Sequence, residues 1–270
     1  MTLPLPPCLD LAQTLDCGQA FRWRPSDADP DRWEGAALGR ALSLRQSGGA
    51  LEADCSLEDW ERIWAPYFDL DEDYALIQAE LAELSPVLAE AAAFAPGIRI
   101  LRQGPWEALC TFILSQNNNI RRIRGLVAEF CQRFGPEIPH SSLRGFPSAE
   151  RTAALSSEDL APLRMGYRAP YLLDAAQKVA RGEIRLEEIQ KEPPAFGREQ
   201  LRKIRGVGPK VAECALLYGF HKTECFPMDV WMKRAMTVLL PGVRPEDFGK
   251  NAGLAQQYIF HYSRMHPELF

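Results

Sequence analysis

The segment Leu201-Arg-Lys-Ile-Arg-Gly-Val-Gly-Pro-Lys-Val-Ala-Glu-Cys-Ala-Leu216 decides how this sequence folds. Apolar residues recur at helical spacing on both sides of residues 206–208, which predicts two helices joined by a tight turn. Gly206 and Gly208 flank Val207, so the backbone can turn sharply while the N–H groups at the start of the second helix face outward. Such N–H groups are suited to hold an anionic oxygen.

Basic side chains surround this turn. Arg202, Lys203 and Arg205 precede it and Lys210 follows it. Two helices, a Gly-Val-Gly turn and adjacent positive charge are typical of a helix–hairpin–helix motif, which binds DNA phosphates without reading the bases. We therefore expect residues 206–208 to contact DNA. The plainer interpretation is a glycine-rich turn that only connects two helices.

Lys210 and Asp229 are the candidates for catalysis. Lys210 opens the second helix, and Asp229 lies in Cys225-Phe-Pro-Met-Asp-Val-Trp231. The helix dipole and nearby cations disfavour the ammonium form of Lys210, and a neutral amine can form a Schiff base with a sugar carbon. A carboxylate at the same opening would stabilise the positive charge that develops on the sugar. The structural alternative is that Asp229 only caps a helix and Lys210 only contacts phosphate.

Composition limits the class of protein. The hydrophobic fraction is 46% and the charged fraction 25%, which is ordinary for a globular protein. We find no signal peptide and no run of about 18 apolar residues that would span a membrane. Seven cysteines without a Cys-x-x-Cys pair argue against a disulfide framework, a zinc site or an iron–sulfur cluster. We expect reduced thiols, no metal and no cofactor.

Charge is unevenly distributed along the chain. The net charge of −5 disfavours a nucleic-acid partner. However, residues 51–90 hold twelve acidic side chains against one arginine, whereas residues 99–133 and 198–234 each carry a balance of +4. We expect the acidic stretch to face away from any bound duplex.

The periodicity of apolar residues changes along the chain. Short segments at 19–23, 33–37, 41–45 and 50–53 predict an antiparallel meander. Helices are expected at 106–114, 121–134, 168–180, 210–220, 230–240 and 253–265. The predicted fold class is α+β, with a small antiparallel β domain and flanking helices at 1–95 and a larger helical domain at 96–270.

The motifs Gly-Val-Gly-Pro-Lys210 and Pro-Met-Asp229 resemble the signature of the helix–hairpin–helix DNA glycosylases of base excision repair. Three further segments are similar to 8-oxoguanine DNA glycosylases: Asp16-Cys-Gly-Gln-Ala-Phe-Arg-Trp23, Ser115-Gln-Asn-Asn-Asn-Ile-Arg-Arg-Ile123 and Gly166-Tyr-Arg-Ala-Pro-Tyr171. The resemblance runs with gaps from about Leu9 to the C-terminus. It implies a TBP-like β domain followed by a helical glycosylase domain.

The resemblance also implies a role for each matching residue. Lys210 would form the Schiff base and Asp229 would be the essential carboxylate. Gly18 would accept a hydrogen bond from N7–H of 8-oxoguanine, a hydrogen that guanine lacks. Cys214, Gln256 and Phe260 would complete the base pocket, Asn117 would enter the duplex, and Arg122 and Arg168 would contact the orphaned cytosine.

Each of these residues has a plainer interpretation. Asn117 is typical of a turn that ends a helix, Gly18 of a bulge in a strand, and Cys214 of a small buried side chain. Arg122 and Arg168 fit solvated helix faces, and Phe260 fits a core. Trp231 departs from the resemblance, because eukaryotic members have a phosphate-contacting histidine there. The four-cysteine cluster of the endonuclease III branch is absent.

The sequence thus predicts a bifunctional DNA glycosylase/AP lyase that flips 8-oxoguanine, and formamidopyrimidine purines, out of duplex DNA. Two alternatives stay open: a non-catalytic helix–hairpin–helix DNA-binding module, and a monofunctional alkylated-base glycosylase, which would not need an amine at 210. The expected partner is double-stranded DNA with an oxidised purine, and no membrane. We expect a monomer, cytoplasmic and nucleoid-associated in a bacterium or nuclear in a eukaryote.

Overall fold

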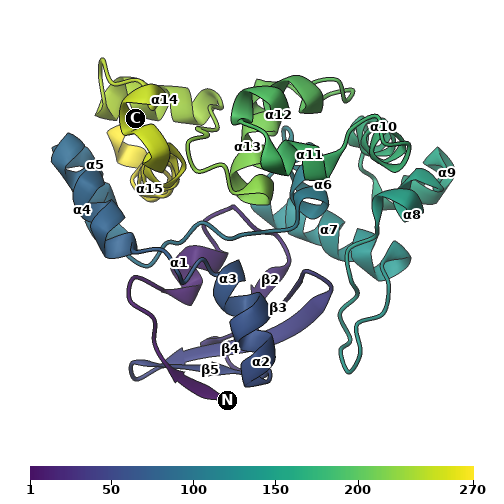
Figure 1. Ribbon diagram of the computed structural model, residues 1–270, viewed down its shortest axis with the longest axis horizontal. Helices are drawn as coiled ribbons and strands as arrows, with labels where there is room; N and C mark the ends of the chain where they lie inside the picture. Colours follow the sequence, from purple (N-terminus) through teal and green to yellow (C-terminus); the bar gives the residue numbers. More distant parts are fainter.

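The computed structural model describes residues 1–270 and consists of a small antiparallel sheet beneath a larger helical body (Figure 1). The sheet contains β1 (Thr2–Pro4), β2 (Trp23–Pro25), β3 (Arg32–Ala37), β4 (Arg40–Ser47) and β5 (Ala50–Ala53). The helices before residue 95 are α1 (Leu11–Leu15), α2 (Leu57–Asp59), a π-helical turn (Trp60–Trp64), α3 (Ala65–Tyr67), α4 (Tyr74–Leu84) and α5 (Pro86–Phe94).

The helical body follows. It contains α6 (Pro105–Ser115), α7 (Ile120–Phe134), α8 (Ala149–Ala153), α9 (Ser157–Leu160), α10 (Arg168–Ala180), α11 (Leu186–Lys191), α12 (Pro194–Leu201), α13 (Pro209–Phe220), α14 (Val230–Leu239) and α15 (Ala252–Met265). Short 3-10 helices lie at Ala161–Leu163, Pro245–Asn251 and Pro267–Leu269. The α+β fold class is confirmed, and the six helices predicted after residue 105 are confirmed to within one residue at each end. None of the helices has the length and apolar character needed to cross a membrane.

The sheet is a meander closed by the N-terminal strand. Its strands are all antiparallel, in the order β1-β5-β4-β3-β2. Trp33 of β3 faces Leu44 of β4 across the ladder, and both are buried. Leu38 and Gly39, and then Gly48 and Gly49, all have positive φ, as two-residue hairpin turns require. Local turn chemistry therefore sets the register of β3, β4 and β5.

The strand predicted at 19–23 is wrong. Strand β2 begins only at Trp23, and residues 17–22 form a loop. Gly18 has φ +92°, which interrupts an extended chain. The buried Gln19 amide donates to the carbonyl oxygens of Thr14 at 2.9 Å and Arg99 at 2.7 Å. These bonds hold the Gly18 loop firmly between the sheet and the helical body.

Helix α13 lies at the centre of the helical body and packs against α6 (Figure 1). Its residues from Cys214 to Phe220 are all buried. Gly219 allows the close approach, because a Cβ there would lie 2.8 Å from the Cβ of Ala108 on α6. Helix α13, whose first turn contains Lys210, is therefore held firmly against α6.

The hydrophobic interior forms two clusters. The smaller one joins the sheet to residues 60–68, and the larger one fills the helical body. Helices α4 and α5 belong to the larger cluster and α5 packs against α15, although both precede residue 95. Cys17 and Phe21 also belong to the larger cluster. The chain thus crosses between the two clusters more than once, and the domain boundary at residue 95 stays a prediction.

Asp69 connects the N-terminal region to the far end of α13. Its carboxylate accepts hydrogen bonds from Tyr74 Oη at 2.8 Å and Arg102 Nε at 2.6 Å. His221, the residue that ends α13, places Nε2 3.4 Å from the same carboxylate. Burial alone would raise the pKa of Asp69. The hydrogen bond and charge of His221, together with the hydrogen bonds from Tyr74 and Arg102, instead hold this pKa below its usual value.

Asp69→Asn should lower the melting temperature at neutral pH, because breaking a buried charged network costs about 3 kcal/mol or more. Since the folded-state pKa is below the unfolded one, this stabilisation is complete above about pH 4 and is lost as pH falls through the folded-state pKa. Thermal melts of both proteins from pH 7 to pH 3 test this. The gap between the melting temperatures should shrink below pH 4; a gap that stays constant would contradict the assignment.

Candidate active site

The predicted hairpin consists of α12, the turn 202–208 and α13. Gly206 has φ +77°, and a Cβ there would overlap the ring of Tyr171 on α10. Val207 is buried and anchors the turn, whereas Gly208 caps α13 without a side chain. The first N–H groups of α13 are therefore left for an external acceptor. Asp174 of α10 fixes the turn by accepting from the Arg205 N–H at 2.7 Å.

Lys210 lies in the first turn of α13, half-buried, with Nζ 5.5 Å from the centre of the Phe112 ring. One turn further along the helix is the fully buried thiol of Cys214. Burial raises the pKa of this thiol, the charge and hydrogen bond of Lys210 oppose the rise, and the negative charge of Asp229 adds to it. Lys210 and Asp229 thus act in opposite directions on the pKa of this thiol, which lies in the second turn of α13.

Asp229 is the N-cap of α14. Its Oδ1 accepts from the Met232 N–H at 2.7 Å, and its side chain is half-exposed. The cap occupies one carboxylate oxygen and leaves lone pairs on the other. Asp229 therefore does cap α14. The same carboxylate can still stabilise a positive charge through its other oxygen.

Gly18 and Phe260 adjoin each other. A Cβ at Gly18 would lie 3.6 Å from Cε1 of Phe260 and 3.8 Å from a guanidinium nitrogen of Arg264. The Arg264 guanidinium lies 5.5 Å from the centre of the Phe260 ring and has no carboxylate partner. Two residues that are far apart in the sequence and were both predicted to hold the base thus meet in space.

Gln256 is buried and lies beside two residues that the sequence did not single out. The Tyr218 hydroxyl donates to Gln257 Oε1 at 2.6 Å and lies 3.2 Å from Gln256 Oε1. Gln257 in turn donates to the carbonyl oxygen of Cys17 at 3.0 Å, next to Gly18. The chain Tyr218–Gln257–Cys17 therefore ties α13 and α15 to the Gly18 loop.

Phe112 is a third residue that the sequence did not single out. Its ring stacks on that of Tyr218, with centroids 5.2 Å apart. The same ring adjoins the Lys210 side chain. Both residues lie within helices predicted at 106–114 and 210–220, and no local signal marks either residue as part of a site.

Asn117 and Arg168 lie together. Asn117 is exposed with φ +46°, a conformation that asparagine tolerates. Arg168 is buried, and its Nη2 donates to the carbonyl oxygen of Asn117 at 2.7 Å, while its Nε donates to that of Gln116 at 2.7 Å. Arg168 is thus no solvated charge: without DNA, it holds the loop that presents Asn117. Its contact with a cytosine stays a prediction.

Arg122 is exposed on the first turn of α7. Its Nη2 donates to the carbonyl oxygen of Arg164 at 3.2 Å, just before the Gly166–Tyr171 segment. The structure therefore brings Asn117, Arg122 and Arg168 to one edge of the helical body.

Trp231 has no free donor. Its indole N–H donates to Ser263 Oγ at 2.9 Å, and its ring packs against Phe270 with centroids 5.4 Å apart. In this conformation Trp231 therefore offers no hydrogen bond to a phosphate.

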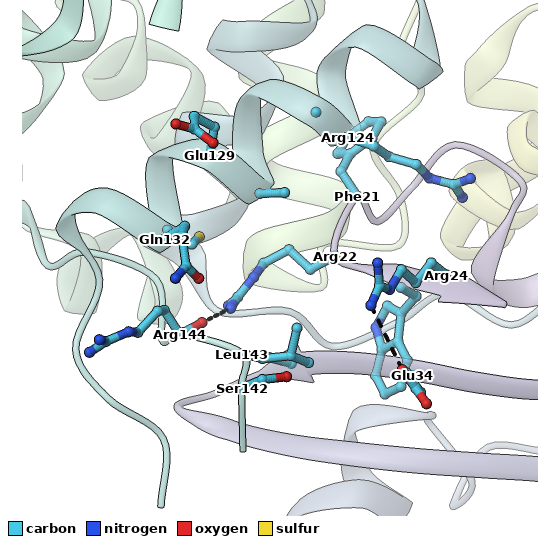
Figure 2. Close-up of a pocket in the computed structure, with 15 residues that line it drawn as sticks. Phe21, Arg22, Arg24, Glu34, Arg124, Glu129, Gln132, Ser142, Leu143 and Arg144 are labelled. Carbon is cyan, nitrogen blue, oxygen red and sulfur yellow. Dashed lines mark hydrogen bonds and ion pairs between the residues drawn. The ribbon is translucent and has the colours of Figure 1, made fainter. Parts of the chain in front are cut away.

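A separate cavity of about 420 Å³ lies between β2, β3 and α7 (Figure 2). It contains none of the predicted site residues. Its arginines are paired within the chain: Arg22 with Glu107 at 3.2 Å, Arg24 with Glu34 at 3.9 Å, Arg124 with Asp16 at 2.7 Å and Arg144 with Glu137 at 3.0 Å. Figure 2 also shows Arg22 donating to the Arg144 carbonyl. With its positive charge balanced, this cavity is not an anion site.

All seven cysteines are free thiols, and no three His, Cys, Asp or Glu side chains lie close enough together to hold a metal ion.

Two family models together cover most of the chain. Residues 3–109 match the model described as 8-oxoguanine DNA glycosylase, N-terminal domain, and residues 110–242 match the HhH-GPD superfamily base excision DNA repair protein.

Individual proteins agree with these matches. The chain is 33% identical over 260 residues to the N-glycosylase/DNA lyase of Saccharomyces cerevisiae. The matched region covers 84% of this chain and 67% of the yeast protein. The structure of MBOgg1 in complex with a low affinity DNA ligand has a TM-score of 0.91 at 37% identity, with 98% of this chain and 96% of that chain covered. The 8-oxoguanine glycosylase/lyase of Clostridium acetobutylicum, in complex with dsDNA containing cytosine opposite to 8-oxoG, has a TM-score of 0.88 at 32% identity over 97% and 93% of the two chains. This chain therefore belongs to the 8-oxoguanine DNA glycosylase family, within the HhH-GPD superfamily of base excision DNA repair proteins.

Proposed function

We propose that this protein is a bifunctional DNA glycosylase/AP lyase that excises 8-oxoguanine from duplex DNA and then cleaves the strand. The observation that carries this proposal is a half-buried amine, Lys210, in the first turn of a helix whose first N–H groups are left for phosphate, in a chain that also presents the half-exposed carboxylate of Asp229. The duplex is its partner, and it acts as a monomer on chromosomal DNA, in the nucleoid or the nucleus.

The first step is base flipping. Unstacking and unpairing the lesion costs a few kcal/mol, which backbone contacts offset. We assign the phosphate contacts to the N–H groups of the turn at Gly206–Gly208. Asn117 then fills the gap in the duplex, while Arg122 and Arg168 bind the orphaned cytosine.

The second step is recognition of the base. Gly18 is the selective residue, because its carbonyl accepts N7–H, which 8-oxoguanine has and guanine lacks. Phe260 stacks on the base, and Gln256 binds its Watson–Crick edge. Since Phe260 lies against Gly18 in the DNA-free chain, we infer that its ring moves aside when the base enters.

The third step is covalent chemistry. Lys210 Nζ attacks C1′ with its lone pair, and the C1′–N9 bond breaks with its electron pair leaving on N9, which takes up a proton. The sugar ring opens, with O4′ becoming a hydroxyl, to give an imine between C1′ and Nζ. Loss of a C2′ proton then expels the 3′ phosphate, and water hydrolyses the imine to release the lysine. The Asp229 carboxylate stabilises the positive charge that develops on the sugar.

A direct comparison of substrates tests the function. The wild-type protein is incubated with duplexes that differ at one base pair: 8-oxoguanine or guanine opposite cytosine, or 3-methyladenine opposite thymine. The free base and the nicked strand are both measured. We expect both products from the 8-oxoguanine duplex only. Binding without any product would indicate a DNA-binding module, and release of 3-methyladenine without a nick would indicate an alkylated-base glycosylase.

Gly18→Ala should slow excision of 8-oxoguanine by roughly 10- to 100-fold, because a side chain is strained at φ +92° and would press on Phe260. Cleavage of a duplex with a preformed abasic site should be nearly unchanged, since no base has to be bound. Gly39→Ala is the matched control: it has φ +75° in a hairpin, with nothing near its Cβ. Equal losses on both substrates would remove Gly18 from base recognition.

A further inference from the structure

The segment that carries Asp229 has little regular structure. Residues 221–229 connect α13 to α14 without a helix or strand. Several bonds fix its first half, among them those from the Lys222 N–H to the Leu216 carbonyl at 3.0 Å and from the Gly253 N–H to the Thr223 carbonyl at 2.7 Å. For residues 226–228, directly before Asp229, one hydrogen bond ties the chain to another element: the Phe226 N–H donates to Glu213 Oε2 at 3.1 Å.

Glu213 belongs to the same helix as Lys210, one turn later. Its side chain is largely buried, and its two oxygens accept three hydrogen bonds. Besides the Phe226 N–H, both oxygens accept from the guanidinium of Arg198 on α12, through Nε and, at 3.3 Å, through Nη2. The hydrogen bond to Glu213 raises the pKa of Arg198 despite its partial burial. Nη2 of Arg198 also lies 3.8 Å from Sγ of Cys225.

These contacts link three parts of the site. Arg198 lies on the first helix of the hairpin, Glu213 on the nucleophile's helix, and Phe226 three residues before Asp229. Helix α13 is rigid and well packed. A side chain on this helix that binds the neighbouring loop therefore fixes the loop relative to Lys210. A carboxylate can do this where an amide or hydroxyl cannot, since only a carboxylate accepts a two-pronged guanidinium and a backbone N–H together.

We propose that Glu213, oriented by Arg198, is a positioning residue that sets the Asp229 carboxylate relative to the Lys210 amine. The proposal rests on the function proposed above. Without Glu213, residues 226–228 lose their bond to α13, and Asp229 keeps its bond to α14 but not its distance from Lys210. A shift of about 1 Å in a reacting group can cost about 10²-fold in rate.

The experiment measures single-turnover excision on an 8-oxoguanine duplex at saturating enzyme, well below each variant's melting temperature, together with duplex affinity by fluorescence anisotropy. Glu213→Ala should lower the excision rate by roughly 10- to 100-fold with affinity within about twofold of wild type. Glu213→Gln keeps an oxygen for Phe226, and Arg198→Ala keeps the whole carboxylate, so both should lose less. These two variants also test the proposal if Glu213→Ala does not fold.

Glu52→Ala is the matched control. Glu52 is an ion-paired glutamate in the distant sheet, 3.2 Å from Arg32, and its removal should leave the excision rate unchanged. A second readout separates positioning from plain stabilisation. In an Asp229→Asn background, Glu213→Ala should cost less than about twofold, because residues that act as a unit are not additive.

Two results would overturn the proposal: a folded Glu213→Ala protein with wild-type excision rate, or a rate loss that is undiminished in the Asp229→Asn background. Failure of the proposed function itself has a different signature, because the wild-type protein would then leave the 8-oxoguanine duplex intact.

Discussion

Lys210→Gln should bind an 8-oxoguanine duplex but neither nick it nor form a covalent adduct when borohydride is added. The amide of glutamine cannot attack C1′, so no imine exists for borohydride to reduce. Base release should fall by on the order of 10⁶-fold, as when another hydrolytic enzyme loses its nucleophile. Affinity should fall little, because the first N–H groups of α13 and the Gly206–Gly208 turn are unaltered.

Lys191→Gln is the control for this change. Lys191 is an exposed lysine at the end of α11, a different helix from that of Lys210, and its replacement should leave trapping at the wild-type level. Gel electrophoresis of borohydride-treated mixtures provides the measurement. An undiminished adduct with Lys210→Gln would assign the amine to another residue.

Asp229→Asn should slow base release by roughly 10²- to 10³-fold, the cost of removing one well-placed electrostatic group. Asparagine is as good an N-cap as aspartate, so the bond to the Met232 N–H and the start of α14 should persist. The melting temperature and the affinity for lesion DNA should therefore stay close to those of the wild type. Only the negative charge beside Lys210 is lost.

Asp73→Asn makes the same change elsewhere. Asp73 caps α4 by accepting from the Leu76 N–H at 3.1 Å, far from Lys210, and this variant should excise 8-oxoguanine normally. Single-turnover rates of the two variants separate charge from capping. Near-normal turnover by Asp229→Asn would reduce Asp229 to a helix cap.

Much of the fold and of the candidate site follows from local sequence. The hairpin was predictable because glycines, a buried valine and flanking helical stripes lie within one short segment, and the helices after residue 105 each have their own apolar periodicity. Lys210 and Asp229 were found because both lie at the starts of helices. The capping geometry at Asp229 is also a local property.

What the sequence did not provide depends on contacts between distant segments. Gln19 looks like part of a strand, yet its buried amide bonds to Thr14 and Arg99 and holds a loop instead. Tyr218 and Gln257 lie within predicted helices without any sign of a role, and only the folded chain connects them to Cys17. Arg168 reads as an exposed charge, but backbone carbonyls of a loop 51 residues earlier bury it. Hydrogen bonds between distant segments leave no periodic pattern in the sequence, so they cannot be predicted from it.

The acidic stretch illustrates the same limit. Its charge was evident and flanking helices were predicted before residue 95, but not that the helices at 74–94 join the larger hydrophobic cluster. Their apolar faces are short and alanine-rich, so the sequence gives only a weak helical stripe. Packing against α15 decides their placement.

The most direct test of the central claim is to locate the covalent bond. Wild-type protein is trapped with borohydride on an 8-oxoguanine duplex, the DNA and protein are digested, and the modified peptide is sequenced by mass spectrometry. We predict a reduced sugar remnant on Nζ of Lys210 and on no other residue. A remnant on a different lysine or on the N-terminal amine, with Lys210 unmodified, would contradict this account.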